Sequence, residues 1–316
     1  MCSSDLRGDP ALTEIRKLFV KPVVFAGAGI SRGDLTLDVR DALARCDLCL
    51  YDALMDTAAL RFLPAGAEAV PVGKRSGDHS VPQEDINTLI LRHARGGRMV
   101  VRLRGGDPGV FGRLAEEVDA VENLRLPYRV LPGVSSFQAA AAEWGILLTR
   151  RGVSRGFTVV TPRREGGGSA DIGRGERAAL PVVVYMGTEK TEEICRSLIG
   201  EGRAADEPAA ALFGIGSPGG FALRSTLAEL PAAVRAAREK DGNAAVPPGL
   251  LVVGAPAAFW APSPSPPSHS RTLGIAARRT GTWPPVLTMI VWPPDSATTP
   301  ARPAASASSP RTASVA

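Results

Sequence analysis

Cysteine and histidine are scarce in this sequence, which limits the chemistry that the chain can carry. Its 316 residues include four cysteines, Cys2, Cys46, Cys49 and Cys195, and three histidines. Four scattered cysteines are too few for a disulfide scaffold. Cys46 and Cys49 form a CxxC motif, but no second pair follows it, so a buried structural role is favoured over a zinc or redox site. We therefore expect no metal centre.

Long apolar segments are also missing. A membrane-spanning helix needs roughly 20 consecutive apolar residues, and no such run occurs. The N-terminus lacks the apolar region of a secretory signal. These absences predict a cytoplasmic protein with no membrane partner.

Charge and proline are concentrated in the last sixty residues. The chain carries a formal net charge of +5, but residues 257–316 hold five arginines against Asp295, which accounts for +4 of it. The basic pI therefore reflects this segment and does not favour a nucleic-acid partner. The same segment contains eleven of the 27 prolines and is expected to be a disordered tail. Residues 1–20 are expected to be a disordered leader.

Between these ends, short apolar runs alternate with helical periodicity, which predicts an α/β fold with a parallel sheet in the first half. Pro132-Gly133 marks a hinge between two α/β domains, residues 21–133 and 134–256, with a ligand cleft between them. Strands are expected at 22–27, 48–51, 67–72, 100–103, 128–131, 157–161, 181–185, 208–213 and 250–253. Helices are expected near 34–43, 53–62, 82–95, 112–122, 135–144, 190–200 and 227–239.

The loop Gly105-Gly106-Asp107 follows one of the buried strands. Ligands of open α/β sheets bind at the carboxyl ends of strands, and glycine lets the backbone approach a ligand closely. A tight turn in which the aspartate caps the next helix is an equally good interpretation.

The first glycine loop has the outline of a dinucleotide site. A strand runs into Gly27-Ala28-Gly29-Ile30-Ser31-Arg32-Gly33, a helix and a second strand follow, and Asp52 occupies the ribose-binding place. The spacing is GxGxxxG, where the dinucleotide motif has GxGxxG. An NAD-type oxidoreductase is therefore a possible alternative function on these residues.

In order and spacing, the loops together resemble the uroporphyrinogen-III C-methyltransferases of the tetrapyrrole methylase family. The resemblance covers roughly residues 22–256, and VGKRSGDHSVPQEDIN at 72–87 is its most specific block. The other matching segments are GAG and DLT within 27–36, LYD at 50–52, VVRLRGGDPGVFGR at 100–113, LPGVSS at 131–136, GILLTRRGVSRGFTVVT at 145–161, VVVYMG at 182–187 and LLVVG at 250–254.

The resemblance implies two α/β domains that hold S-adenosylmethionine (SAM) between them, usually in a homodimer. It implies two successive methylations that convert uroporphyrinogen III to precorrin-2 for sirohaem and cobalamin synthesis. Asp52 resembles the proton acceptor and Lys74 the proton donor, although Asp52 as a strand-end helix cap stays an alternative. The residues implied for cofactor binding are Gly105, Gly106, Asp107, Val110, Ser135, Ser136 and Met186.

Uroporphyrinogen is a polycarboxylate, so its binding site should contain cations. Arg75, Arg102 and Arg113 lie in or beside the matching loops, and arginine can donate two parallel hydrogen bonds to a carboxylate. Ordinary solvated surface charge is the alternative for each of them.

The chain departs from the family pattern in its first loop. GAGISRGDLT stands where the family usually has GAGPGDPDLLT, and LTRRGV stands where it has LTHRDV. No cofactor contact is assigned to Ile30 or Ile215. Three further hypotheses are therefore kept: a methyltransferase of a later precorrin, the NAD-type oxidoreductase, and a binding module without catalysis.

Overall fold

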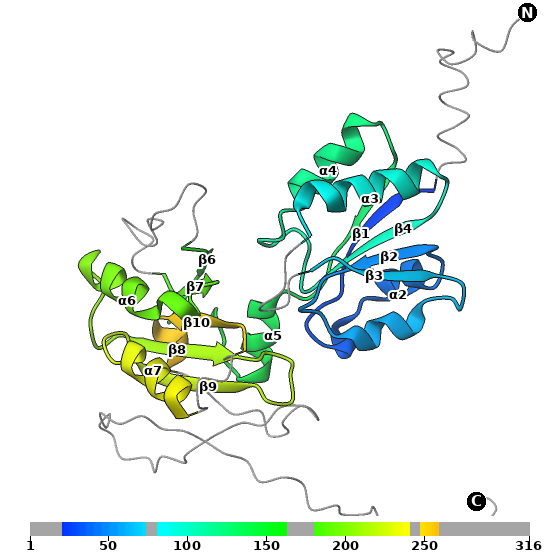
Figure 1. The fold of residues 1–316 in the computed structure, drawn as a ribbon. Coiled ribbons are helices and arrows are strands. Elements are labelled where there is room, and N and C mark those ends of the chain that lie inside the picture. Colours follow the sequence, from blue (N-terminus) through cyan, green and yellow to red (C-terminus); the bar gives the residue numbers. More distant parts are fainter. Residues whose placement is uncertain (1–20, 74–80, 163–179, 241–246, 259–316) are drawn as a thin grey trace, which may run out of the picture.

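The computed structural model describes residues 21–73, 81–162, 180–240 and 247–258. Within them the chain forms two five-stranded sheets, each flanked by helices (Figure 1). The expected α/β fold class is confirmed. The predicted leader and all but the first two residues of the predicted tail lie outside the described residues, and the domain boundary at residue 133 stays a prediction.

The first sheet is parallel throughout, as predicted. Every residue of its strand β1 (Val23–Gly27) is buried, which is typical of a parallel strand covered on both faces. The other strands are β2 (Leu48–Tyr51), β3 (Glu68–Pro71), β4 (Val100–Arg104) and β5 (Tyr128–Leu131), and the order is β3-β2-β4-β1-β5.

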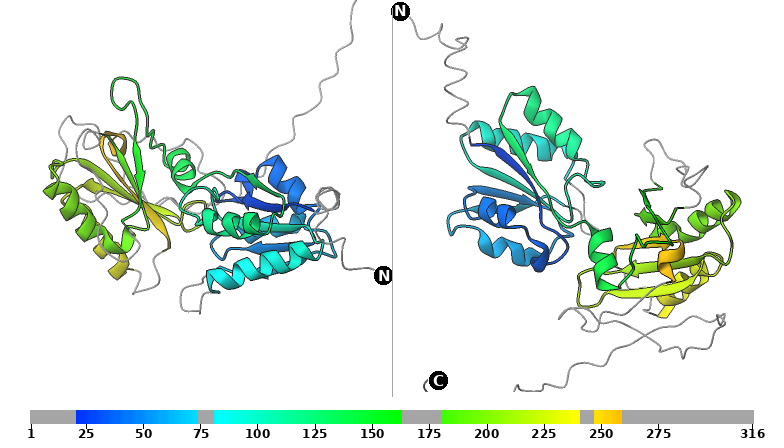
Figure 2. Two further views of the ribbon diagram at one scale, coloured as in Figure 1. Left: turned by 90° about the horizontal axis from the view of Figure 1, so that it is seen from above. Right: turned by 180° about the vertical axis from the view of Figure 1, so that it is seen from behind.

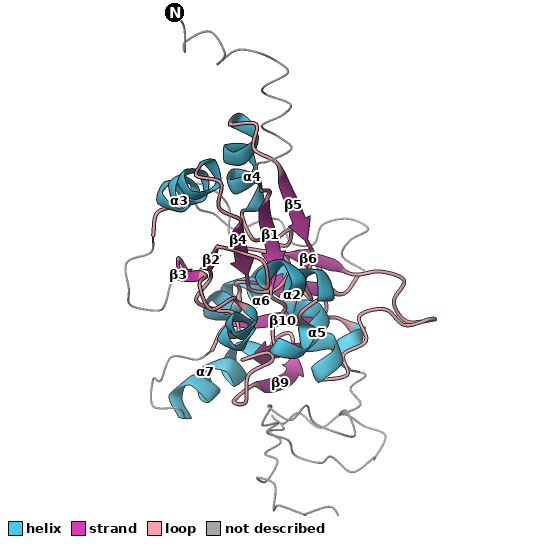
Figure 3. Ribbon diagram, turned by 90° about the vertical axis from the view of Figure 1, so that its right-hand side faces the viewer, coloured by secondary structure: helices cyan, strands magenta, loops and turns pink. Residues whose placement is uncertain are grey.

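Helices cover both faces of this sheet (Figure 3). α3 (Gln83–Arg95) and α4 (Leu114–Asn123) contact each other on one face, and α2 (Leu37–Leu43) packs on the other with a 3-10 helix, Thr57–Phe62. The helix predicted near 53–62 is therefore wrong in type and length, because only the part from residue 57 is helical and it is a 3-10 helix.

Local sequence explains where these helices begin and end. Thr36 caps α2 by accepting a hydrogen bond from the backbone N–H of Val39 at 3.3 Å, as N-cap threonines do. In α3, Ile86, Ile90 and Ala94 recur every four residues and are buried on one face, and the helix ends at Gly96.

The second sheet has mixed strand directions, which the sequence pattern did not predict. β6 runs parallel to β7, and the remaining neighbours are antiparallel. β9 was not predicted at all and forms an antiparallel pair with β8. The strands are β6 (Thr158–Val160), β7 (Val182–Tyr185), β8 (Pro208–Phe213), β9 (Phe221–Thr226) and β10 (Gly249–Val253), in the order β6-β7-β10-β8-β9.

The short helix α5 (Ser136–Glu143) lies between the two sheets (Figures 1 and 2). Its Ala140 and the following Trp144 pack into the apolar layer on one face of the second sheet. α6 (Thr191–Gly200) and α7 (Leu230–Lys240) cover the opposite face. The amino end of α5 thus lies where the chain passes from one sheet to the other.

Candidate functional site

Three glycines meet at the carboxyl ends of β1, β4 and β5. A Cβ atom at Gly27 would lie 2.6 Å from the carbonyl oxygen of Gly106 and 2.6 Å from the backbone nitrogen of Gly133. Real Cβ atoms do not come so close to backbone atoms, so any larger residue would push these loops apart. The backbones of Gly29 and Gly106 also exchange two hydrogen bonds, of 2.8 and 3.2 Å. The GAG and GGD motifs are therefore parts of one junction.

Asp107 joins this junction to the next loop. Its carboxylate accepts a hydrogen bond from the backbone N–H of Gly133 at 3.0 Å and another from that of Gly109 at 2.8 Å. Val110 closes the turn, because its N–H donates to the Asp107 carbonyl at 3.2 Å. The suggested role of Asp107 as a helix cap is wrong, since α4 begins only at Leu114. Its carboxylate ties two loops together.

Three segments of the chain lie close to Gly105 and Gly106. Gly106 has φ +73°, and a Cβ atom there would lie 3.8–3.9 Å from the Ile30 side chain and the backbone of Val134 and Ser135. Gly105 lies against the chain that follows β2, since its Cβ position is 3.7 Å from the Leu54 carbonyl oxygen. The two glycines therefore lie beside backbone carbonyl groups and one aliphatic side chain, and Asp107 follows them directly in the chain.

Two aspartates hold the backbone of the first glycine loop through hydrogen bonds. The Asp34 carboxylate accepts hydrogen bonds from the backbone N–H groups of Ile30 (3.2 Å) and Ser31 (2.9 Å). The Arg32 N–H donates to Asp56 at 3.0 Å. Ile30 is also packed against the second half, because a Cβ atom at Gly216 would lie 2.6 Å from its Cγ2. The loop therefore contacts both halves of the chain.

Tyr185, which the sequence analysis did not single out, connects several of the predicted site segments. Its ring lies 4.9 Å from that of Phe111, centroid to centroid, and its hydroxyl accepts a hydrogen bond from the backbone N–H of Phe137 at 3.2 Å. Burial raises the pKa of this hydroxyl, its hydrogen bonds with Ser136 and Phe137 act in the opposite direction, and the charge of Asp107 raises the pKa again. In the sequence, the one indication that Tyr185 belongs to the site was its position in the VVVYMG segment, directly before Met186.

Two of the predicted cofactor residues outside the GGD loop, Ser136 and Met186, lie next to this tyrosine. Ser135 is buried and begins α5 in a capping box with Gln138. Met186 follows Tyr185 directly, with φ +54° and 42% of its surface exposed. Phe111 and Arg113 also have positive φ values. Such backbone conformations are costly outside glycine and concentrate at functional sites.

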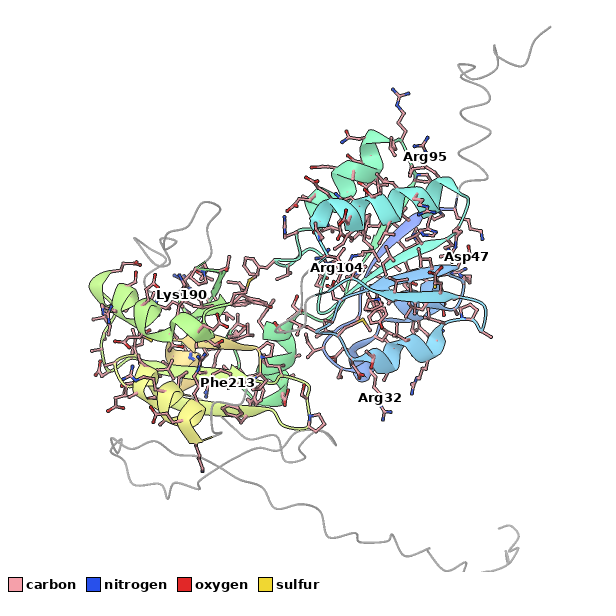
Figure 4. The ribbon with its side chains drawn as sticks, viewed as in Figure 1. Arg32, Asp47, Arg95, Arg104, Lys190 and Phe213 are labelled. Atoms are coloured by element: carbon pink, nitrogen blue, oxygen red, sulfur yellow. The ribbon has the colours of Figure 1, made fainter. Side chains whose placement is uncertain are left out.

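Asp52 is held by two arginines of β4. Arg102 Nη2 lies 2.5 Å from Asp52 Oδ1, and Arg104 Nε lies 3.7 Å from Asp52 Oδ2. Glu117 of α4 lies behind them, 3.1 Å from Arg102 Nε and 2.8 Å from Arg104 Nη1. Figure 4 labels Arg104 on the side of the first sheet that is nearest the second half. The Asp52 side chain keeps 24% of its surface exposed.

The arginines predicted to bind the substrate differ in burial and in the partners they contact. Arg102 is 1% exposed and its guanidinium is used by the protein itself, so the structure contradicts its prediction as a direct substrate contact. Arg113 is exposed and forms a two-point contact with Glu116 at 2.6 and 2.7 Å. Lys74 and Arg75 lie outside the described residues.

The dinucleotide interpretation of the first loop is wrong. The known dinucleotide fold has the strand order 3-2-1-4-5-6, with the first two strands adjacent, whereas here β4 lies between β1 and β2. The glycine loop also leads into a 3-10 turn at Arg32–Asp34, and α2 begins only at Leu37. The first glycine loop therefore does not lead directly into the N-terminus of an α-helix, as a dinucleotide-binding loop does.

The CxxC thiols are buried, Cys46 just before β2 and Cys49 within it. Cys46 and Cys49 are buried and free, and burial raises their pKa values to about 11 and about 12. A protonated, inaccessible thiol is a poor metal ligand. Within the ranges that the structure describes, no cluster of three His, Cys, Asp or Glu side chains could hold a metal ion. Likewise, none of the helices described there is long and apolar enough to cross a bilayer.

Comparison with known proteins fits this geometry. The family model of Tetrapyrrole (Corrin/Porphyrin) Methylases matches residues 22–231. The chain belongs to this family. This tetrapyrrole methylase is 38% identical over 236 residues to Siroheme synthase 2 of Halorhodospira halophila, covering 74% of this chain and 46% of the relative. It is 39% identical to Siroheme synthase of Photorhabdus laumondii over 79% of this chain and 49% of that protein. It spans about half the length of these curated relatives.

Solved structures support the same family. The uroporphyrin-III C-methyl transferase of Thermus thermophilus, complexed with S-adenyl homocysteine, is 34% identical, with a TM-score of 0.60, and covers 74% of this tetrapyrrole methylase and 98% of that chain. Its native form gives the same TM-score at 33% identity, over 74% of this chain and 92% of that chain. The family resemblance inferred from the motifs is therefore confirmed.

Proposed function

We propose that this tetrapyrrole methylase is a SAM-dependent uroporphyrinogen-III C-methyltransferase, which forms precorrin-2 by two successive methylations. The observation that carries the proposal is the contact between Gly105 and the chain after β2. Because Leu54 lies beside Gly105, the proposed cofactor loop and the carboxylate of Asp52 share one edge of the sheet. The relative from Thermus thermophilus, solved with the demethylated cofactor, supports the same assignment.

The residues present fit SAM. When bound, SAM supplies an electrophilic methyl group on a positively charged sulfur. Gly105 and Gly106 would lie against the cofactor with their backbone, and Val110, Ser135, Ser136 and Met186 would enclose it. Asp107 brings a carboxylate to this space, where its two oxygens accept backbone hydrogen bonds from Gly109 and Gly133. An anionic side chain there would favour a cationic ligand over a neutral one.

Asp52 is proposed to accept the proton that the substrate loses. A bond forms between a pyrrole carbon and the methyl carbon as the bond from methyl to sulfur breaks, and the sulfur keeps that electron pair. The ring system then loses a proton, and the electrons of the broken C–H bond restore its neutrality. A carboxylate within hydrogen-bond reach can take this proton. Lys74 is proposed as the proton donor, and Arg75 and Arg113 as contacts of the substrate carboxylates.

The test is turnover with a defined substrate. Purified protein, SAM and enzymatically generated uroporphyrinogen III should give a dimethylated tetrapyrrole and two equivalents of S-adenosylhomocysteine, detected by mass spectrometry. If methylation appears only when a later precorrin is supplied, the proposed substrate is wrong. If SAM binds but neither uroporphyrinogen III nor a later precorrin is methylated, the protein is a binding module without catalysis.

The catalytic assignments need matched controls. Asp52→Ala and Lys74→Ala should each lower turnover strongly. Asp41→Ala and Lys190→Ala remove an exposed aspartate and an exposed lysine that pair with Arg40 and Glu193, and they should leave turnover unchanged. Full activity of both Asp52→Ala and Lys74→Ala would show that the two roles are wrong.

A homodimer is proposed on the family resemblance alone. Light scattering coupled to gel filtration should give twice the 33.0 kDa mass of the chain. A monomer mass at micromolar concentration would contradict it.

A further inference from the structure

Glu117 is the most deeply buried charged residue of the cluster around Asp52. It comes from α4, its side chain is fully inaccessible, and its Oε1 lies 3.1 Å from Arg102 Nε and 2.8 Å from Arg104 Nη1. The amide of Gln83 donates to the same oxygen at 3.1 Å. A carboxylate is costly to bury unless it is paired in this way. Burial of the Glu117 carboxylate is therefore offset by the two arginines, and burial of their guanidinium groups is offset by Glu117.

Arg102 connects Glu117 to Asp52, because it donates hydrogen bonds to both carboxylates. Its Nε donates to Glu117, its Nη1 donates to the carbonyl oxygens of Leu50 (3.3 Å) and Leu103 (3.2 Å), and its Nη2 donates to Asp52. Every nitrogen of the planar group is thus fixed in direction. Burial by itself lowers the pKa of Arg102, but the charges of Asp52 and Glu117 outweigh it and the pKa is raised. The guanidinium is a rigid connection between two carboxylates.

The four charges form a neutral set that is open to solvent mainly through Asp52. The exposed fraction of the side chains is zero for Glu117, 2% for Arg102, 11% for Arg104 and 24% for Asp52. Buried ion pairs contribute little net stability, because desolvation offsets the attraction. Burying these charges costs desolvation free energy and adds little stability, and it leaves the Asp52 carboxylate accessible. The arrangement is therefore suited to orienting that carboxylate.

We propose that Glu117 is a positioning residue that acts through Arg102 and Arg104 to hold the Asp52 carboxylate in its reactive orientation. The inference rests on the proposed function, in which Asp52 accepts a proton. It adds a residue on α4 that has no direct access to a substrate.

The first experiment is kinetic and uses Glu117→Gln, which keeps the shape of the side chain and removes its charge. We expect kcat to fall about 10- to 100-fold, the size of effect that loss of alignment at a reacting group produces. The KM values for SAM and for uroporphyrinogen III should stay within about two-fold, because Glu117 contacts neither. In an Asp52→Asn background, Glu117→Gln should have no further effect on kcat.

Glu207→Gln is the matched control. Glu207 pairs with the buried Arg203 in the second half of the chain, with contacts of 2.6 and 2.8 Å. This substitution also removes a carboxylate from a buried arginine, so it lowers stability through the same kind of loss. It should leave kcat unchanged and should combine additively with Asp52→Asn.

The second experiment does not depend on activity. Urea unfolding of the single variants Asp52→Asn and Glu117→Gln and of the double variant, without cofactor or substrate, should show that their effects do not add. The corresponding cycle with Glu207→Gln should be additive. This result would stand even if uroporphyrinogen III proved to be the wrong substrate.

Two results would overturn the proposal. One is a Glu117→Gln variant that is destabilised but keeps kcat within about two-fold of the parent, and the other is additivity with Asp52→Asn in both measurements. If Glu117→Gln does not fold, Gln83→Leu takes its place, because it removes one hydrogen bond to Glu117 and leaves all four charges. It should lower kcat by a smaller factor in the same direction, and an unchanged kcat would also count against the proposal.

Discussion

The rings of Phe111 and Tyr185 lie 4.9 Å apart in a tilted contact, although one follows β4 in the first sheet and the other ends β7 in the second. Aromatic pairs at this distance contribute about 0.5–1.5 kcal/mol beyond their buried area. The contact links the GGD loop to the segment that carries Met186. Because the Tyr185 hydroxyl also bonds to the start of α5, this tyrosine fixes three loops relative to one another.

Tyr185→Phe should therefore weaken SAM binding without changing the fold. It keeps the ring contact and removes the hydroxyl that accepts from Phe137, a loss of about 0.5–1.5 kcal/mol, or roughly 2- to 10-fold in Kd. Isothermal titration with SAM measures it. Tyr128→Phe is the control, since the Tyr128 hydroxyl bonds only to the exposed Glu122 among the described contacts. Equal Kd values for the two variants would contradict the role given to Tyr185.

Asp107 should show separable structural and cofactor roles. Asp107→Asn removes the charge and keeps one acceptor oxygen, which can still accept the part-buried N–H of Gly133 while the exposed N–H of Gly109 turns to water. Its free energy of unfolding should therefore fall less than that of Asp107→Ala, while SAM affinity falls. Asp107→Ala leaves two backbone donors without this acceptor and should also lose about 1–3 kcal/mol of stability. Urea unfolding and calorimetric titration on both variants distinguish the roles. An Asn variant with unchanged SAM affinity would show that the charge is not used.

Gly133→Ala should be strongly destabilising. Its Cβ atom would lie 2.8 Å from the Cα of Gly27, in a junction that cannot expand without separating β1 from the GGD loop. Overpacking of this kind costs about 1–3 kcal/mol. Gly66→Ala is the control, because a Cβ atom there meets nothing within 4 Å. The midpoint of urea unfolding should fall only for the first variant, and a parent-like midpoint for Gly133→Ala would show that the junction is loosely packed.

The buried thiols should be unreactive in the folded protein. Burial raises the pKa values of Cys46, Cys49 and Cys195 to about 11, 12 and 12. A Cys2→Ser variant should therefore release almost no thionitrobenzoate from Ellman's reagent at pH 8, and three equivalents after unfolding in urea. Fast reaction of the native variant would mean that one of these thiols is accessible.

The same shifts predict a loss of stability at alkaline pH. A folded-state pKa above the unfolded value of about 9 means that the folded protein binds more protons in this range. The stabilisation is complete below pH 9 and declines as the pH rises towards 11 and 12. Urea unfolding at pH 8 and pH 10.5 measures this decline. Cys49→Ala removes one of the two thiols whose pKa is raised to about 12 and should show a shallower decline than the parent.

The sequence by itself determined the parallel sheet, the order of its elements and the family. Apolar strands, helix caps such as Thr36 and glycine loops are local patterns, and each was sufficient to place an element within a few residues. The same patterns suggested a dinucleotide site, because a strand, a glycine loop and a later acid are also local. The position of β4 between β1 and β2 and the 3-10 turn that follows the glycine loop exclude it.

Tertiary structure alone decided how the charges around Asp52 are used. Arg102 looked like a substrate contact because a sequence shows the charge of an arginine but not its burial. In the folded chain it is enclosed between Asp52 and Glu117, residues that come from other elements of the first sheet and its helices. Tyr185 and Phe111 were likewise unremarkable until the two sheets brought them together. Contacts between distant segments depend on the packing of whole elements, which local pattern does not specify.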